Sequence, residues 1–208
     1  FYETYYIVKF RDFSSLTYDD KESSSYENVK KKNNYDTPYI PTPFYFLKIV
    51  CSFLKKKKID DFLILDLGCG YSRVQYFFSI YFYSFFLGVD INKKIIKSLK
   101  KKKIKKASFL NLNLRKVKNI KLLVTEIKKI KKKKKLIVFF SDSFDLNLLK
   151  KVLKNLSYKL NFYCILINVK KASFLSKKYK TLFIKEFKDS NKNIKIFKLK
   201  WIKTKLKF

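Results

Sequence analysis

The sequence is poor in glycine and contains neither histidine nor methionine. Its 208 residues include three Gly, three Pro and three Cys. The absence of histidine excludes zinc sites of the Cys/His kind and catalytic triads that depend on an imidazole base. The cysteines, Cys51, Cys69 and Cys164, are scattered and odd in number, so they do not form a disulfide framework. We therefore expect a reducing, cytoplasmic compartment.

Acidic residues are scarce, and the formal net charge is +34. Residues 1–50 hold seven acids and seven Lys or Arg, whereas residues 51–208 hold nine acids and 43 Lys or Arg. Such a surface attracts nucleic acid or an anionic membrane. The alternative is composition: nearly all of the excess is Lys, and Asn, Ile, Phe and Tyr are also frequent, as in AT-rich genomes. The positive charge is therefore the only reason to expect nucleic acid as a partner.

One apolar run, residues 74–91, approaches the length of a membrane span. It reads VQYFFSIYFYSFFLGVDI and contains Gln75, Ser79, Ser84 and Asp90. A span needs about 20 predominantly apolar residues. The polar residues and Gly88 instead predict a buried helix followed by a buried strand, so we expect no membrane span.

The remaining chain alternates short apolar runs with segments of helical spacing. Strands are predicted at 62–67, 85–89, 107–112, 136–140, 163–168, 182–187 and 194–199, and helices at 73–83, 92–102, 120–132, 145–156 and 172–179. This alternation predicts a parallel sheet with helices on both faces, closed by an antiparallel hairpin at one edge. The predicted fold is α/β, Rossmann-like and doubly wound, with a mostly parallel seven-stranded sheet.

Residues 1–42 precede this alternation and differ from it in composition. They are polar and Ser-rich, and they end in DTPYIPTPF, which holds all three prolines. We assign 1–42 to an N-terminal arm with a stiffened proline-rich segment, and 43–208 to the α/β domain. Thr42 and Pro43 predict the start of a helix, with Thr42 as N-cap and Pro43 at the first helical position.

Two of the three glycines lie in LILDLGCGYSR, directly after the first predicted strand. Gly68 and Gly70 permit positive φ angles and a close approach of backbone to a ligand. The second predicted strand ends in Gly88-Val89-Asp90, and Asp90 lies 20 residues after Gly70. A carboxylate at that place accepts hydrogen bonds from both hydroxyls of a ribose. The two strand ends therefore predict a nucleotide-cofactor site.

The acid before the glycines distinguishes between two cofactor classes. A dinucleotide site has a third glycine in G-x-G-x-x-G, where this chain has Arg73. Asp66 would repel a pyrophosphate but suits a ligand that carries an ammonium group. S-adenosylmethionine has an ammonium group, a ribose and an adenine. The pattern therefore favours S-adenosylmethionine over NAD.

These motifs resemble a known family. DLGCGYSR followed by GVDIN is similar to motifs I and II of the class I S-adenosylmethionine-dependent methyltransferases. YDTPYIPTPF also resembles a segment of a bacterial Y-x-P-T-P subgroup and of the ATP synthase c-subunit lysine methyltransferase type. The resemblance implies that Asp66, Gly68, Cys69 and Gly70 form the loop around the methionine part of the cofactor. It also implies that Asp90 and Ile91 lie at the ribose and its base.

Three further positions are interpreted through this resemblance. The family usually has a third loop glycine where this chain has Ser72, which we expect to cap the following helix. Asn113 stands where the family often has an acid that meets the adenine amino group, and its amide oxygen can accept the same bond. Asp142, after the fourth strand, is the catalytic candidate that would orient or deprotonate an amine nucleophile. The alternative role for Asp142 is to cap the helix that begins near Asp145.

The functional hypothesis is therefore methyl transfer from S-adenosylmethionine by a monomer. Holding nucleophile, methyl and sulfur in line supplies most of such an acceleration, so no triad is needed. The methyl acceptor is open between a protein amine, RNA and a small molecule. The alternative hypothesis is a non-enzymatic, basic nucleic-acid-binding protein on a degenerate methyltransferase scaffold. No metal site is predicted.

Overall fold

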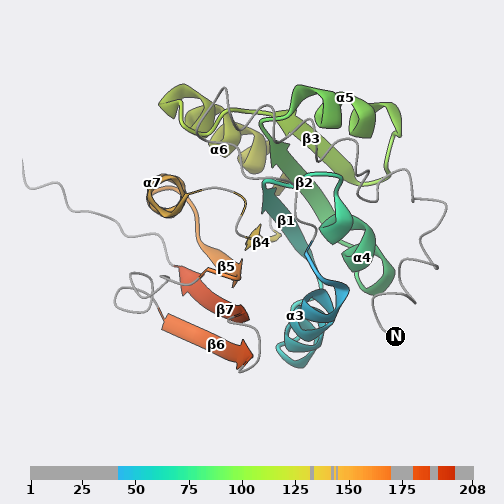
Figure 1. Cartoon of the computed structure of the whole chain (residues 1–208), viewed down its shortest axis with the longest axis vertical. Coiled ribbons are helices and arrows are strands. Elements are labelled where there is room, and N and C mark those ends of the chain that lie inside the picture. Colours follow the sequence, from blue (N-terminus) through green and yellow to red (C-terminus); the bar gives the residue numbers. More distant parts are fainter. Residues whose placement is uncertain are drawn as a thin grey trace, which may run out of the picture.

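The computed structural model describes residues 42–131, 134–141, 143, 145–169, 180–187 and 192–199 (Figure 1). Five helices and seven strands alternate along this part of the chain. The helices are α3 (Phe44–Lys56), α4 (Arg73–Tyr81), α5 (Lys93–Lys101), α6 (Val117–Lys131) and α7 (Leu146–Ser157). The strands are β1 (Phe62–Leu67), β2 (Phe85–Asp90), β3 (Ala107–Asn111), β4 (Lys135–Ser141), β5 (Phe162–Ile167), β6 (Lys180–Phe187) and β7 (Lys192–Leu199).

The seven strands form one sheet in the order β3-β2-β1-β4-β5-β7-β6. The first five are parallel, and β7 is antiparallel to both of its neighbours, β5 and β6. The sheet confirms the predicted fold class, including the terminal hairpin. The last strand does not lie at the edge, however: it is inserted between β5 and β6, and β6 forms the border of the sheet.

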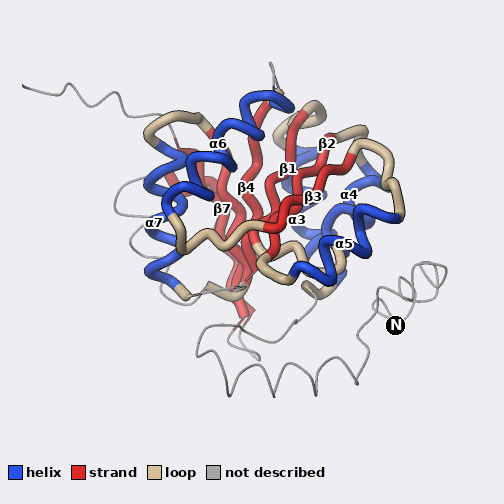
Figure 2. The backbone as a smooth tube through the Cα atoms, turned by 90° about the horizontal axis from the view of Figure 1, so that it is seen from above, coloured by secondary structure: helices blue, strands red, loops and turns tan. Residues whose placement is uncertain are grey.

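Helices cover both faces of the sheet, as Figure 2 shows. α3, α4 and α5 pack on one face and α6 and α7 on the other, each against its own apolar cluster. The central strand β1 is buried at every position because its side chains face a helix layer on both sides. Asp66 is the one acidic residue of β1, so the central strand of the sheet holds a single buried carboxylate.

The long apolar run is divided as the sequence indicates. Its first part forms α4 and its second part forms β2, separated by the exposed Tyr83. Among the described residues, no helix is both long and apolar enough to span a membrane.

The start of the first described helix differs from the prediction. α3 begins at Phe44 with Pro43 as its N-cap, and no side chain caps it. The assignment of Thr42 as N-cap is wrong by one residue because the Pro43 backbone is still extended, at ψ 135°. Thr42 instead presents its carbonyl to Arg73 Nη1, at 3.4 Å. The predicted N-terminal arm and the predicted helix at 172–179 lie outside the described residues.

A glycine-poor chain must use other residues where the backbone requires a positive φ. Gly68 and Gly70 occupy two such positions. The others are filled by residues with a Cβ: Lys58, Ser72, Lys103, Lys106 and Asn168. Each costs about 1–2 kcal/mol relative to glycine. Gly68 and Gly70 avoid this cost in the loop after β1.

Candidate functional site

The candidate site lies at the carboxyl ends of the parallel strands, where the strand order changes direction. β1 is flanked by β2 on one side and by β4 on the other, so the connections after β1 and β4 leave the sheet in opposite directions. In open α/β sheets this is where ligands bind. The loop 68–72, which joins β1 to α4, lies at this point.

The loop is held against the end of β2 by backbone hydrogen bonds. Gly68 N–H and Cys69 N–H both donate to Val89 O, at 2.8 and 3.1 Å. Gly68 has φ +83° and Gly70 has φ +47°, values that place both in the left-handed region. The loop therefore turns sharply back over β2 before α4 begins.

Two glycines are also required by close packing. A Cβ on Gly68 would lie 2.2 Å from Ser143 Cβ, in the loop after β4. A Cβ on Gly88 would lie 2.8 Å from Cys69 Sγ and from Phe109 Cδ1. Because Gly88 has no side chain, Cys69 can pack against β2. This contact holds the loop 68–72 against the sheet.

Asp90 connects this loop to the segment after β2. Its Oδ2 accepts from Gly70 N–H at 2.9 Å, and its Oδ1 accepts from Asn92 N–H at 2.8 Å. Both bonds fix the orientation of the carboxylate at this edge of the sheet. Asn111, paired with Asp90 across β2 and β3, donates from Nδ2 to Asp90 O and Ile91 O at 3.1 and 2.8 Å. The Ile91 side chain is 45% exposed beside them.

Asp66 is the most unusual residue of the site. It is 2% exposed at the end of β1, and its Oδ2 has no hydrogen-bond partner. Burial, and secondly the neighbouring Asp90 carboxylate, raise the pKa of Asp66 well above its usual value. A buried polar atom without a partner requires an explanation, and a bound cationic donor is one. Two carboxylates close together, one of them unsatisfied, favour a ligand with both a positive charge and hydroxyl groups.

Comparison with solved structures identifies the fold. An RNA methyltransferase from Salinibacter ruber, crystallised with S-adenosyl-L-homocysteine, matches with a TM-score of 0.54 at 12% identity, over 77% of this chain and 94% of that one. The N-methyltransferase NodS from Bradyrhizobium japonicum WM9 matches with 0.53 at 10% identity, over 84% and 97%. A putative methylase from Haemophilus influenzae matches with 0.52 at 15% identity, over 74% and 88%. This is the class I methyltransferase fold. No protein-family model and no curated protein sequence matches the chain.

The position of the missing third glycine of the methyltransferase loop is occupied by Ser72 in the left-handed conformation. Ser72 has φ 69° and ψ 29°, is fully buried, and precedes α4 without capping it. Its Oγ has no hydrogen-bond partner. The expectation that Ser72 caps the helix is wrong, because a capping side chain requires an extended N-cap backbone. The backbone here still has the shape that glycine would adopt.

Two of the residues predicted to contact a cofactor take part in local structure. Asn113, two residues beyond β3, accepts from Arg115 N–H at 3.0 Å through Oδ1, which leaves one lone pair. Cys69 is buried, and burial raises the pKa of its thiol well above the usual value. The thiol therefore remains protonated and acts as a small packing group rather than a nucleophile.

The catalytic candidate Asp142 lies outside the described residues. Its neighbour in sequence, Ser143, is described and donates from Oγ to Ser141 O at 3.2 Å. The cap of α7 is Asp145, whose Oδ1 accepts from Leu148 N–H at 2.8 Å, so α7 does not need Asp142. Asp145 Oδ2 also forms an ion pair with Arg115 at 3.2 Å, which joins the loops after β3 and β4.

Three residues of this edge were not predicted from the sequence. Asn111 braces the Asp90 backbone, and Ser143 packs on Gly68. Asn168 follows β5 with φ 61°, and its Oδ1 is buried without a hydrogen-bond partner. Polar residues directly after a strand were the only available signal, and that signal alone does not separate site residues from turn residues.

Proposed function

We propose that the chain is an S-adenosylmethionine-dependent methyltransferase. The observation that carries this proposal is the buried Asp66 carboxylate, whose free Oδ2 lies beside the two-glycine loop and the oriented Asp90 carboxylate. An ammonium group at Asp66 would satisfy the orphan oxygen. It would also remove the repulsion between the two carboxylates. NAD offers no ammonium group to this position.

The residues of the edge fit the parts of this cofactor in order. Asp66 would hold the methionine ammonium, with Gly68 and Gly70 allowing the backbone to approach. Asp90 would accept hydrogen bonds from the two ribose hydroxyls. The exposed apolar side chain of Ile91 would cover one face of the adenine, and Asn113 would accept from its amino group with its remaining lone pair.

Bound S-adenosylmethionine would supply an electrophilic methyl group, so the chain needs only to align the acceptor. With the ribose at β2 and the methionine at β1, the acceptor side of the sheet is that of β4 and β5. Ser143 and Asn168 are the described polar residues there, and we keep Asp142 as the proposed group that orients or deprotonates the nucleophile. Alignment alone contributes up to about 7–11 kcal/mol.

The comparisons do not identify the methyl acceptor. One similar structure is an RNA methyltransferase, and another, from Synechocystis, methylates magnesium protoporphyrin IX. Tritiated S-adenosylmethionine can be added to a cell lysate together with the protein. Separation of protein, RNA and small molecules then identifies the fraction that accepts the methyl group.

Calorimetric titration with S-adenosylhomocysteine tests the proposal directly. We expect binding by the wild type and a loss of more than tenfold in affinity for Asp90→Ala, because both ribose hydrogen bonds to a charged group are removed. Asp60→Ala, at an exposed acid before β1, is the matched control and should bind normally. Absence of binding at millimolar cofactor would overturn the proposal. Salt-dependent RNA binding without any methyl transfer would instead support the non-enzymatic alternative.

A further inference from the structure

One stretch of the sequence is rich in basic residues and contains no acidic residue, although its Arg115 forms an ion pair with Asp145. Residues 91–125 contain 13 Lys or Arg and no Asp or Glu. This stretch comprises α5, β3 and the first part of α6, and we call it the basic surface. The surface acids described elsewhere are largely paired, as in the ion pairs of Asp61 with Lys134 and of Glu126 with Lys129.

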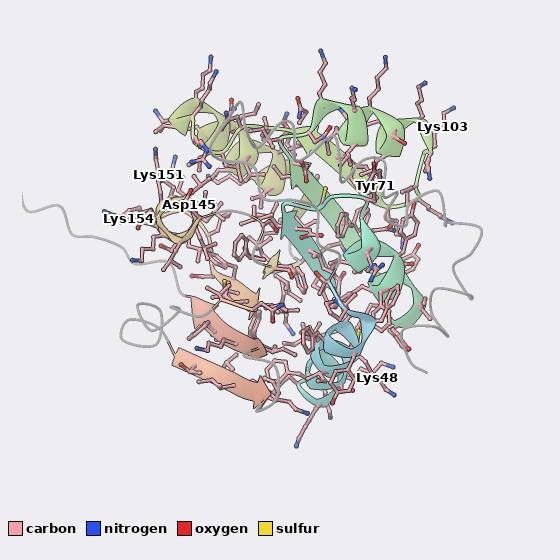
Figure 3. The ribbon with its side chains drawn as sticks, in the orientation of Figure 1. Lys48, Tyr71, Lys103, Asp145, Lys151 and Lys154 are labelled. Atoms are coloured by element: carbon pink, nitrogen blue, oxygen red, sulfur yellow. The ribbon has the colours of Figure 1, made fainter. Side chains whose placement is uncertain are left out.

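α5 directs its lysines away from the core. Ile95, Ile96 and Leu99 are buried against the sheet, and the lysines of the helix are all exposed. Figure 3 shows side-chain nitrogen atoms projecting outward from both α5 and α6, and it labels Lys103 at the turn after α5. α5 presents no exposed large apolar residue with which an interfacial helix enters a membrane, whereas Ile91 before it and Val117 and Leu122 of α6 are exposed.

The charge of α5 weakens the helix that carries it. Lys93 with Lys97, and Lys97 with Lys101, are like charges one turn apart, and each pair costs about 0.2–0.5 kcal/mol. Lys93 and Lys94 also lie at the positive end of the helix dipole. Helix stability therefore does not account for these residues.

Two lysines of the basic surface occupy backbone positions that favour asparagine. Lys103 and Lys106 have φ values of 44° and 58°, a conformation that asparagine adopts more readily than lysine. Asparagine is also frequent in this chain, and the same composition favours it. Lys103 keeps an exposed positive charge at such a position, whereas the Lys106 Nζ is buried and Lys58 has the same conformation outside the basic surface.

The basic surface begins at the candidate cofactor site. α5 starts three residues after Asp90, and Arg115 and Lys116 lie just beyond β3 at the same edge of the sheet. We propose that this surface binds the phosphate backbone of single-stranded RNA, from which a neighbouring nucleotide extends along the carboxyl edge of the sheet to the acceptor side at β4 and β5. A single strand is required because a base inside a duplex cannot reach the edge of the sheet, whereas RNA loops expose their bases. This inference rests on the proposed function for the transfer, but not for the binding.

The test compares two variants with equal loss of charge. The surface variant replaces Lys94, Lys97, Lys101 and Lys103 by Gln. The control variant replaces Lys56, Lys57, Lys154 and Lys159 by Gln, and all eight residues are exposed. Figure 3 places Lys154 on α7, across the molecule from Lys103. Both variants lower the net charge from +34 by four.

Fluorescence anisotropy with a labelled oligouridylate measures binding over a range of salt. If the four substitutions remove four phosphate contacts, the slope of log K against log salt becomes less steep by about 3 in the surface variant. Over a fourfold rise in salt, the wild type then loses about 50-fold more affinity than the surface variant. The control variant should retain the wild-type slope. In the lysate assay, tritium should enter the RNA fraction and decrease only in the surface variant.

Three outcomes overturn the inference. The first is equal loss of RNA affinity in both variants, which would mean that overall charge alone is responsible. The second is displacement of the RNA by phosphatidylcholine–phosphatidylserine vesicles that bind through the same four lysines. The third is methyl label confined to the protein or small-molecule fraction. Calorimetry with S-adenosylhomocysteine separates these outcomes from failure of the proposed function, since none of the four substituted lysines belongs to the proposed cofactor site.

Discussion

Cofactor binding should be coupled to release of a proton from Asp66. Burial and the nearby Asp90 carboxylate raise the pKa of Asp66 in the free protein. An ammonium group at Oδ2 would favour the ionised form and return that pKa toward lower values. Affinity should therefore rise with pH, by up to about tenfold per unit, until the raised pKa of the free protein is passed.

The variant Asp66→Asn removes the charge and keeps the shape. Asp66 is only 2% exposed, so solvent screens the lost interaction very little. A charge-assisted hydrogen bond contributes about 1.5–3 kcal/mol, which corresponds to about 10–150-fold in affinity. The pH dependence of binding should disappear together with this affinity.

Calorimetry in buffers of different ionisation enthalpy measures the proton directly. S-adenosylhomocysteine should release up to one proton per site from the wild type at a pH between the ordinary pKa of Asp and the raised pKa of Asp66, and none from Asp66→Asn. 5′-Methylthioadenosine carries the same adenosine and sulfur without the amino acid, so its affinity should be equal for both proteins. Equal weakening of both ligands by Asp66→Asn would refute the assignment of Asp66 to the ammonium group.

Three further predictions concern stability, measured by thermal unfolding. The folded state binds a proton at Asp66 more tightly than the unfolded chain does. The stability that this proton contributes is complete below the ordinary Asp pKa and is lost as pH rises through the raised pKa. Asp66→Asn should therefore be more stable than wild type at neutral pH and lose this advantage in acid. Ser72→Gly should gain about 1–2 kcal/mol by relieving the positive φ, or about 2–8 °C in Tm, whereas Ser72→Ala keeps the φ and should gain less. Gly88→Ala should lose about 1–3 kcal/mol through its contact with Cys69, and Cys69→Ala should restore part of that loss; purely additive effects would contradict the contact.

The arrangement of strands and helices was predictable because local patterns carry it. The period of apolar residues separates α4 from β2 inside one apolar run, and the order of elements predicts a parallel sheet. The insertion of β7 beside β5 was not predictable. Pairing partners depend on contacts distant in sequence, and either strand of the hairpin has apolar residues for a central position.

The sequence by itself determined the strand, the loop and the two acids of the candidate site, because these depend on residue type and spacing. Tertiary structure decided how they act. The Gly70–Asp90 bond joins residues 20 apart, and Ser143 lies against Gly68 from 75 residues away. The burial that leaves Asp66 without a partner requires helix layers on both faces of the sheet. The sequence places the third glycine, Gly88, two residues before Asp90, but its packing against Cys69 exists only when the ends of β1 and β2 lie side by side.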